Sequence, residues 1–320
     1  MIRASVLPFL LAAAFVAALL LPWAPLSGLF DQDRSLAAAV LIELRLPRAA
    51  LALVYGATLG AAGAAVQALF ANPLASPDLT GTTSGAALGA VVTAYLLGFA
   101  APIALSIGAV AGALGALGLL LALAGPRAET ATLLLSGLAI SALAGALTTL
   151  ALALAPSPFA FYDAYDWLMG SLVDRSLAQT AFAAVPALLT IAWLLRLALP
   201  LDRLALGEEV AEALGHDVAR LRLTIVCLTA LGVGACVAIC GAIGFIGLVA
   251  PIFARRLTGG HPGRAILPAA MIGALLLIAA DLAARLAPLG RTLPIGVVTA
   301  LLGAPFFLWL VAHMRWRLSE

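Results

Sequence analysis

Four short stretches in the first third of the chain decide its fold: LRLPR at residues 44–48, GAAVQ at 63–67, NPLASPD at 72–78 and GTTSGAA at 81–87. Two arginines and a proline open a long run of apolar and small residues, and an Asn-Pro pair closes it. Proline lacks a backbone N–H, and the residue before it is displaced from helical geometry. The pattern therefore predicts one helix that ends near Asn72 and a second, small-residue helix that starts near residue 80.

The composition is that of a helical membrane protein. Apolar residues make up 64% of the 320 residues and charged residues 10%, against roughly 25% charged in soluble domains. The charges lie between apolar stretches long enough to cross a bilayer. We therefore predict an all-α, polytopic fold with one transmembrane domain over residues 1–320. The first stretch is interpreted as a retained helix rather than a signal peptide. The ten predicted membrane helices are 6–26, 47–69, 80–98, 102–124, 131–155, 178–199, 223–241, 244–257, 266–287 and 293–314.

Arginine placement predicts the orientation. With both termini in the cytoplasm, most of the 17 arginines fall on the inner side, as the positive-inside rule requires. The Gly-Ala pair ten residues before Pro73 recurs ten residues before Pro251, in a helix predicted to run the opposite way. This echo indicates an inverted repeat, a common plan in transporters.

Two chemistries are disfavoured by residue content. The chain has no lysine, and a P-loop needs one to reach the nucleotide phosphates, so any ATP hydrolysis must come from a partner. Three cysteines, Cys227, Cys236 and Cys240, share an apolar helix without evident further ligands. We interpret them as packing residues and predict no metal site.

Two later motifs, GAIGFIGLVAP at residues 241–251 and LPIGVVTALLGAPFF at 293–307, complete a set. Together with the four above, they resemble the FecCD-type permeases of bacterial ABC importers for iron–siderophores, haem and cobalamin. The resemblance implies a non-enzymatic permease subunit in the bacterial inner membrane. It also implies a second copy of the chain, two cytoplasmic ATPase subunits that use ATP and Mg²⁺, and a periplasmic substrate-binding protein. We expect contact with lipid, no nucleic acid and no cofactor on this chain. The expected cargo is a metal chelate. The Ser-Pro-Asp ending of the Asn-Pro motif, at residues 76–78, looks more like that of iron–siderophore permeases, so an iron–siderophore is favoured, with haem or cobalamin as alternatives.

Three arginines are predicted on the outer side, against the charge rule: Arg45 and Arg48 just outside the second helix, and Arg285 near the end of the ninth. The resemblance implies that they dock the acidic residues of a binding protein, a contact that would steer encounter and set register. Two other interpretations remain open, a local Asp281–Arg285 pair and interfacial snorkelling of Arg45 and Arg48.

Two cytoplasmic elements are predicted. Asn72 and Leu74, with Thr130 at the start of the fifth helix, match the family's cytoplasmic gate, although Asn-Pro could be a simple helix stop. The polar segment 201–222 predicts one short helix ended by Gly215 and another beginning at 217–222. The resemblance implies that this segment couples to the ATPase subunits, and a solvated loop is the alternative. Its candidate coupling residues are Glu208, Glu209, Glu212, Ala213, Gly215, Arg220 and Arg222.

The outer loop 156–175 is rich in aromatic residues, which could form an interfacial belt or line a ligand-binding mouth. Its W-x-x-G-S at residues 167–171 also matches the family. Ile252 departs from the family pattern, in which a histidine often follows the proline that corresponds to Pro251. Two rival functions remain. An ion-coupled transporter would need a mid-membrane ionisable group, for which Asp281 is the candidate, and an intramembrane enzyme would need a nucleophile–base pair.

Overall fold

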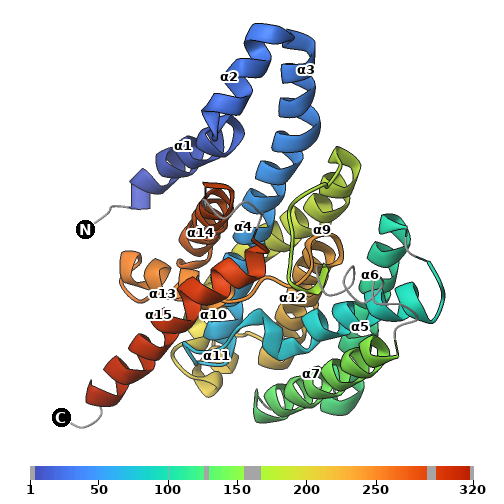
Figure 1. Ribbon diagram of the computed structural model, residues 1–320. Helices are drawn as coiled ribbons and strands as arrows, with labels where there is room; N and C mark the ends of the chain where they lie inside the picture. Colours follow the sequence, from blue (N-terminus) through green and yellow to red (C-terminus); the bar gives the residue numbers. More distant parts are fainter. Residues whose placement is uncertain (1–3, 100, 126–129, 155–166, 287–292, 318–320) are drawn as a thin grey trace.

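The computed structural model describes all residues except 1–3, 100, 126–129, 155–166, 287–292 and 318–320, and its regular elements are all helices (Figure 1). This confirms the predicted all-α class. In chain order the elements are η1 (Ala4–Val6), α1 (Leu7–Leu20), α2 (Trp23–Gln32), α3 (Arg34–Ala39), the π-helix η2 (Val40–Arg45), α4 (Leu46–Leu69), η3 (Pro77–Thr80), α5 (Thr82–Tyr95), α6 (Pro102–Ala124), α7 (Thr130–Ala153), α9 (Leu177–Arg196), α10 (Ala198–Leu204), α11 (Glu208–Ala213), α12 (Val218–Cys240), α13 (Ile246–Leu257), α14 (Ile266–Leu286) and α15 (Ile295–Arg317).

Helix α4 is the centre of the bundle. It packs against α9, α12, α13 and α14, and most of its residues are buried. Its glycines make this possible: a Cβ atom at Gly56 would overlap the backbone of Gly273, and one at Gly63 would overlap Gly247. In lipid, such close backbone contact replaces the hydrophobic force that joins helices in water.

Close backbone contact at glycines also joins α5 to α6. Gly85 and Gly89 face Gly112 and Gly108, and a Cβ atom at any of the four would meet the opposite helix. The GTTSGAA stretch thus starts α5 and also supplies part of its contact surface with α6.

Six helical runs in the described part are long and apolar enough to cross a membrane, and two further apolar helices are shorter. Each of the ten predicted segments contains a helix, so the predicted count is roughly consistent with the structure. The six runs are Arg34–Leu69, Ile103–Ala124, Ala131–Ala153, Leu177–Arg196, Val218–Cys240 and Ile266–Leu286; the shorter two are Leu7–Leu20 and Ile295–Phe306.

Three predicted boundaries are wrong. The first helix ends at Leu20 and not at 26, because Leu21 precedes Pro22 and takes an extended backbone. The second begins at Arg34, since α3, η2 and α4 form one continuous helical run. The seventh begins at Val218, where the Asp217 side chain caps its first turn.

Helices α4 and α12 run in opposite directions, as predicted. Tyr55, in the first half of α4, donates a hydrogen bond to the carbonyl of Gly241 at the far end of α12, over 3.1 Å. The opposite end of α4 contacts α10, which precedes α12 in the chain. An inverted repeat fits this arrangement and stays a prediction.

Candidate functional site

Two of the three arginines predicted on the outer side, Arg45 and Arg285, hold the end of α1. Helix termini leave four carbonyls without intrahelical donors, and here each carbonyl from Ala17 to Leu20 receives one. Leu21 N–H donates to Ala17, and the Arg285 guanidinium donates to Ala18 over 2.9 Å. Arg45 donates to Leu19, Leu20 and Pro22 over 2.9–3.1 Å. Cations at a helix C-terminus also complement its dipole.

Arg48 and Arg285 share one carboxylate. Arg48 on α4 contacts Asp281 on α14 at 2.8 Å, and Arg285 forms a second salt bridge with the same side chain. Asp281 is fully buried and the two arginine side chains are 16% and 8% exposed. The predicted Asp281–Arg285 pair is therefore confirmed, and Arg48 joins it. The expectation that Arg45 and Arg48 lie outside the second helix is wrong, because the helical run begins at Arg34. Their docking role stays a prediction.

The W-x-x-G-S stretch is a junction between helix ends. Ser171 N–H donates to the carbonyl of Cys240 at the end of α12, over 2.7 Å. Gly170 accepts from Ile295 N–H, and Met169 accepts from Gly296 N–H, at the start of α15. Gly170 adopts a positive φ of 78°, a backbone conformation that glycine takes readily. The aromatic residues at 159, 161, 162 and 165 lie outside the described residues.

The Asn-Pro segment makes an ordered turn at the end of α4. The side-chain oxygen of Asn72 accepts from Leu74 N–H over 2.9 Å, the local bond by which Asn stabilises turns. The following η3 packs on α7, where a Cβ atom at Gly137 would overlap the Leu79 carbonyl. Thr130 is the first residue of α7, and its side chain lies outside the described atoms. Gly137 is seven residues further along α7, or about 10 Å, so the structure places η3 against the helix interior and not at its start.

Asp78 organises the start of α5. Thr83 donates to one carboxylate oxygen over 2.9 Å, and the Ser76 hydroxyl lies 3.5 Å from the other. Desolvation raises the pKa of Asp78 above its ordinary value, and these two hydrogen bonds act in the opposite direction. The polar residues at 76–83 therefore bind one another, and they hold the connection from α4 to α5.

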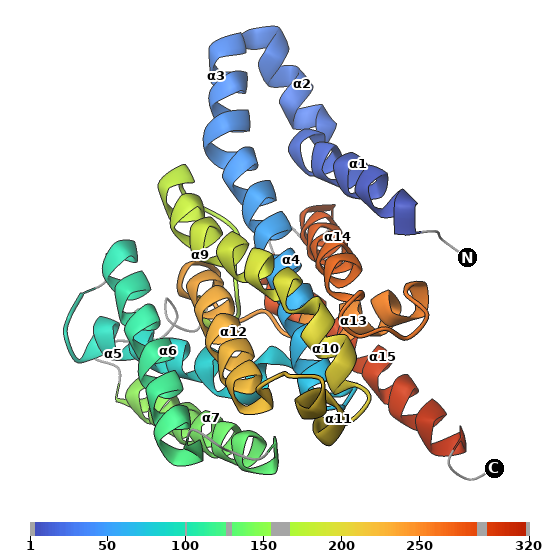
Figure 2. The same cartoon turned by 180° about the vertical axis from the view of Figure 1, so that it is seen from behind.

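Two short helices, α10 and α11, lie at the end of the bundle away from α2 and α3 (Figure 2). Gly215 ends α11 with a φ of 85°, as predicted, and His216 N–H reaches back to the Ala211 carbonyl. The predicted second helix at 217–222 is the first turn of α12 and not a separate element. The additional short helix is α10, which lies before the predicted pair.

The candidate coupling residues fall into two groups: those that form an internal salt bridge, and those that are exposed on the surface of the protein. Arg222 is 9% exposed and forms a salt bridge with Glu208, so it holds α11 against α12. Glu209 and Arg220 are exposed, as are Glu212, Ala213 and Gly215. Exposed apolar side chains accompany them: Leu206, Val210 and Leu214 are 66%, 43% and 49% exposed. An apolar surface beside acidic residues is suited to contact with another protein.

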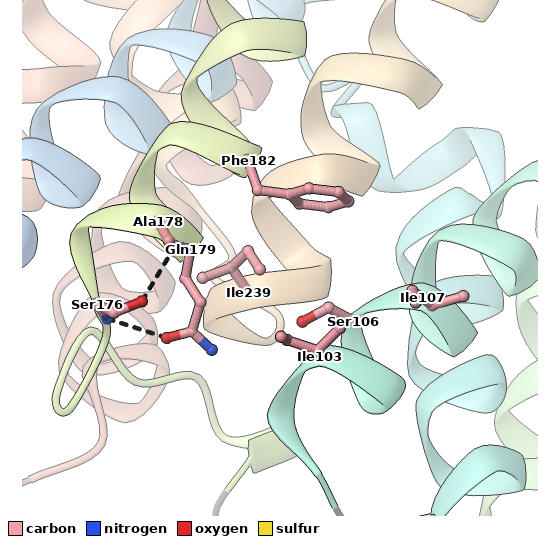
Figure 3. Close-up of a pocket in the computed structure, with 8 residues that line it drawn as sticks. All are labelled: Ile103, Ser106, Ile107, Ser176, Ala178, Gln179, Phe182 and Ile239. Carbon is pink, nitrogen blue, oxygen red and sulfur yellow. Dashed lines mark hydrogen bonds between the residues drawn. The ribbon is translucent and has the colours of Figure 1, made fainter.

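The start of α6, the start of α9 and the end of α12 line a cavity of about 530 Å³ (Figure 3). Ile103, Phe182 and Ile239 supply apolar walls. Gln179 also lines it, but its side-chain oxygen accepts from Ser176 N–H in the capping box of α9. Among the described residues, the eight that line it include no titratable side chain that could serve as a general acid or base.

Within the described part of the chain, His, Cys, Asp and Glu form no group of three that could hold a metal ion. The absence of a metal site on this chain stays a prediction, since part of the chain lies outside that description.

These features define a class: a polytopic helical membrane protein with a buried central helix, glycine-mediated helix contacts and short helices at one end. The profile of the FecCD transport family matches residues 5–313, and the chain belongs to this family. The chain is 42% identical over 295 residues to the vitamin B12 import system permease protein BtuC of Vibrio cholerae serotype O1, covering 89% of this chain and 86% of that protein.

Two further comparisons agree. The Fe(3+) dicitrate transport system permease protein FecD of Escherichia coli is 40% identical over 280 residues, covering 86% of each protein. A solved structure described as an inward-facing ABC transporter of the metal-chelate type superposes with a TM-score of 0.85 at 32% identity. That superposition covers 97% of this chain and 98% of the solved one. The resemblance inferred from the six motifs is confirmed.

Proposed function

We propose that this chain is the permease subunit of a binding-protein-dependent ABC importer that moves a metal chelate across the bacterial inner membrane. The observation that carries the proposal is the family match over residues 5–313 together with relatives named as permeases for vitamin B12 and iron(III) dicitrate. The cargo class follows from those relatives. We favour an iron chelate because of the Ser-Pro-Asp ending of the Asn-Pro motif, with cobalamin and haem as the alternatives.

The surface around α11 supports the proposal of a partner that couples ATP hydrolysis to transport. The apolar side chains of Leu206, Val210 and Leu214 lie exposed beside Glu209 and Glu212, and Arg222 holds their helix in place. Two cytoplasmic ATPase subunits would bind here, and ATP and Mg²⁺ would be bound by them. A second copy of this chain would complete the pathway, and a periplasmic binding protein would deliver the chelate.

The structure disfavours the ion-coupled alternative. A coupling carboxylate must gain and lose a proton within the membrane. Asp281 is fully buried and forms salt bridges with both Arg48 and Arg285, so its carboxylate already has protein partners and is not a free ion-binding group. The intramembrane-enzyme alternative gains no support from a family of transport permeases.

Co-purification tests the proposal. The chain, expressed with a candidate ATPase and a candidate binding protein from the same genome, should purify as a complex whose ATP hydrolysis increases when the loaded binding protein is added. Mass spectrometry of the ligand on that binding protein would name the cargo. Failure of the ATPase to associate with a stably folded chain would contradict the proposal.

A further inference from the structure

A second cavity, of about 580 Å³, lies on the outer surface of the bundle where α1 and α13 both pack on α14. Figures 1 and 2 show α1 and α13 next to α14. Leu7 and Leu10 of α1, Phe253 of α13, and Ile272 and Leu282 of α14 line this groove. Its walls are almost entirely apolar, and a groove between membrane helices with such walls is open to lipid chains.

The length of the groove matches one leaflet. Along α14 its lining extends from Ile272 to Leu282, ten residues or about 15 Å at the helical rise. This is about half of the roughly 30 Å hydrocarbon core. A single acyl chain could therefore lie along the groove.

One end of the groove carries a positive charge. Arg256, in the last turn of α13, is the one charged residue among those that line it. Its side chain is exposed, and within the described part of the chain it forms no salt bridge. Leu7 begins α1 at this same end, which the predicted orientation places in the cytoplasmic leaflet. A basic residue at the cytoplasmic end of a pocket between membrane helices suits an anionic lipid headgroup.

We propose that this groove binds one anionic phospholipid of the inner leaflet, with an acyl chain along α14 and the phosphate at Arg256. A phospholipid matches the groove better than a second protein copy does. Its acyl chain is apolar along its length, like the groove walls, and its headgroup carries a negative charge at one end, where Arg256 lies. Such a lipid would fill the space between α1 and α13 and bind both helices to α14.

Native mass spectrometry tests the proposal on the full chain in mild detergent, with phosphatidylglycerol and phosphatidylethanolamine of identical acyl chains added in equal amounts. The wild-type chain should retain phosphatidylglycerol preferentially. Arg256→Gln should reduce that retention about fivefold, the factor for one basic residue near a membrane surface, and leave phosphatidylethanolamine unchanged. Arg264→Gln is the matched control, since Arg264 is exposed after α13 but does not line the groove.

A second pair of variants tests the acyl chain. Ala279→Phe would fill the groove and should reduce retention of both lipids, whereas Ala283→Phe, exposed on the same helix outside the lining, should not. Equal retention of the two lipids by the wild type would overturn the proposal. Unchanged phosphatidylglycerol retention in both Arg256→Gln and Ala279→Phe would do the same. If Ala279→Phe instead lowers the oligomeric mass with lipid retention intact, a protein copy covers the groove and the lipid site is refuted.

Discussion

Arg48 on α4 and Asp281 on α14 are 233 residues apart in the chain and form a 2.8 Å salt bridge with the carboxylate fully buried. Arg285 binds the same carboxylate and also reaches the end of α1. Helices α4 and α14 therefore meet at one acid, and Arg285 joins α1 to them. These arginines have a structural function whether or not they also dock a partner.

Removing that acid should destabilise the protein. Asp281→Ala leaves Arg48 and Arg285 without their carboxylate, and loss of one member of a buried pair costs about 3–5 kcal/mol. We expect a clear fall in Tm for the purified protein in detergent. Glu43→Ala is the control, because Glu43 is an exposed acidic residue on the helical run that carries Arg48. Equal Tm values for Asp281→Ala and the wild type would show that the cluster contributes nothing to stability.

Reversing two outer charges should weaken docking of the binding protein. Arg45→Glu with Arg48→Glu replaces attraction by repulsion, and exposed pairs contribute roughly 0.2–1 kcal/mol each, with more at a buried interface. The loss of affinity should be large at low salt and should shrink as salt is raised. Reversing acidic residues on the binding protein should partly restore it.

Because both arginines also have internal partners, Tm must be recorded with the affinity. The double Arg→Gln variant is the matched control, since it removes charge without adding repulsion and should fall between wild type and the double Glu variant. If the double Glu variant docks normally at low salt with an unchanged Tm, the docking prediction is wrong, and neither arginine is needed to dock the binding protein.

Breaking α11 should uncouple the permease from its ATPase. Ala213→Pro removes a helical N–H and places a ring against the preceding turn, at a cost of about 3 kcal/mol in that helix. We expect loss of ATPase binding and uptake while the protein still inserts in the membrane. Ala213→Ser keeps the N–H at the same exposed position and should behave as wild type. Normal uptake by a stably inserted Ala213→Pro variant would count heavily against a coupling role.

The isolated chain should not hydrolyse ATP. It has no lysine to complete a P-loop, so phosphate release from the purified chain, measured with a coupled colorimetric assay, should stay at background. Reproducible hydrolysis that co-elutes with the chain and survives a second purification step would refute this prediction.

Local patterns in the sequence predicted much of the fold. The apolar runs located a helix in each of ten segments. Gly215 was correctly assigned to the end of α11. These predictions succeeded because each depends on hydropathy or backbone freedom within a few residues of chain.

Features that depend on tertiary contact were missed. The helical run extends back to Arg34 although residues 34–45 contain three charged side chains, which hydropathy counts against a membrane helix. Pro22 was visible in the sequence and could have signalled the end of α1. The sharing of Asp281 by Arg48 and Arg285, and the lipid-sized groove at α14, require segments from opposite ends of the chain to meet, and no local pattern encodes them.

The central claim is best tested by uptake into proteoliposomes that hold the chain together with its ATPase, with the binding protein supplied outside. Radiolabelled iron(III) citrate and cyanocobalamin serve as the two probes, chosen from the named relatives. We expect uptake of one probe that requires enclosed ATP, the ATPase and the binding protein together, and that does not change when proton or sodium gradients are imposed. Gradient-driven uptake by the chain alone, without ATP or the ATPase, would contradict it.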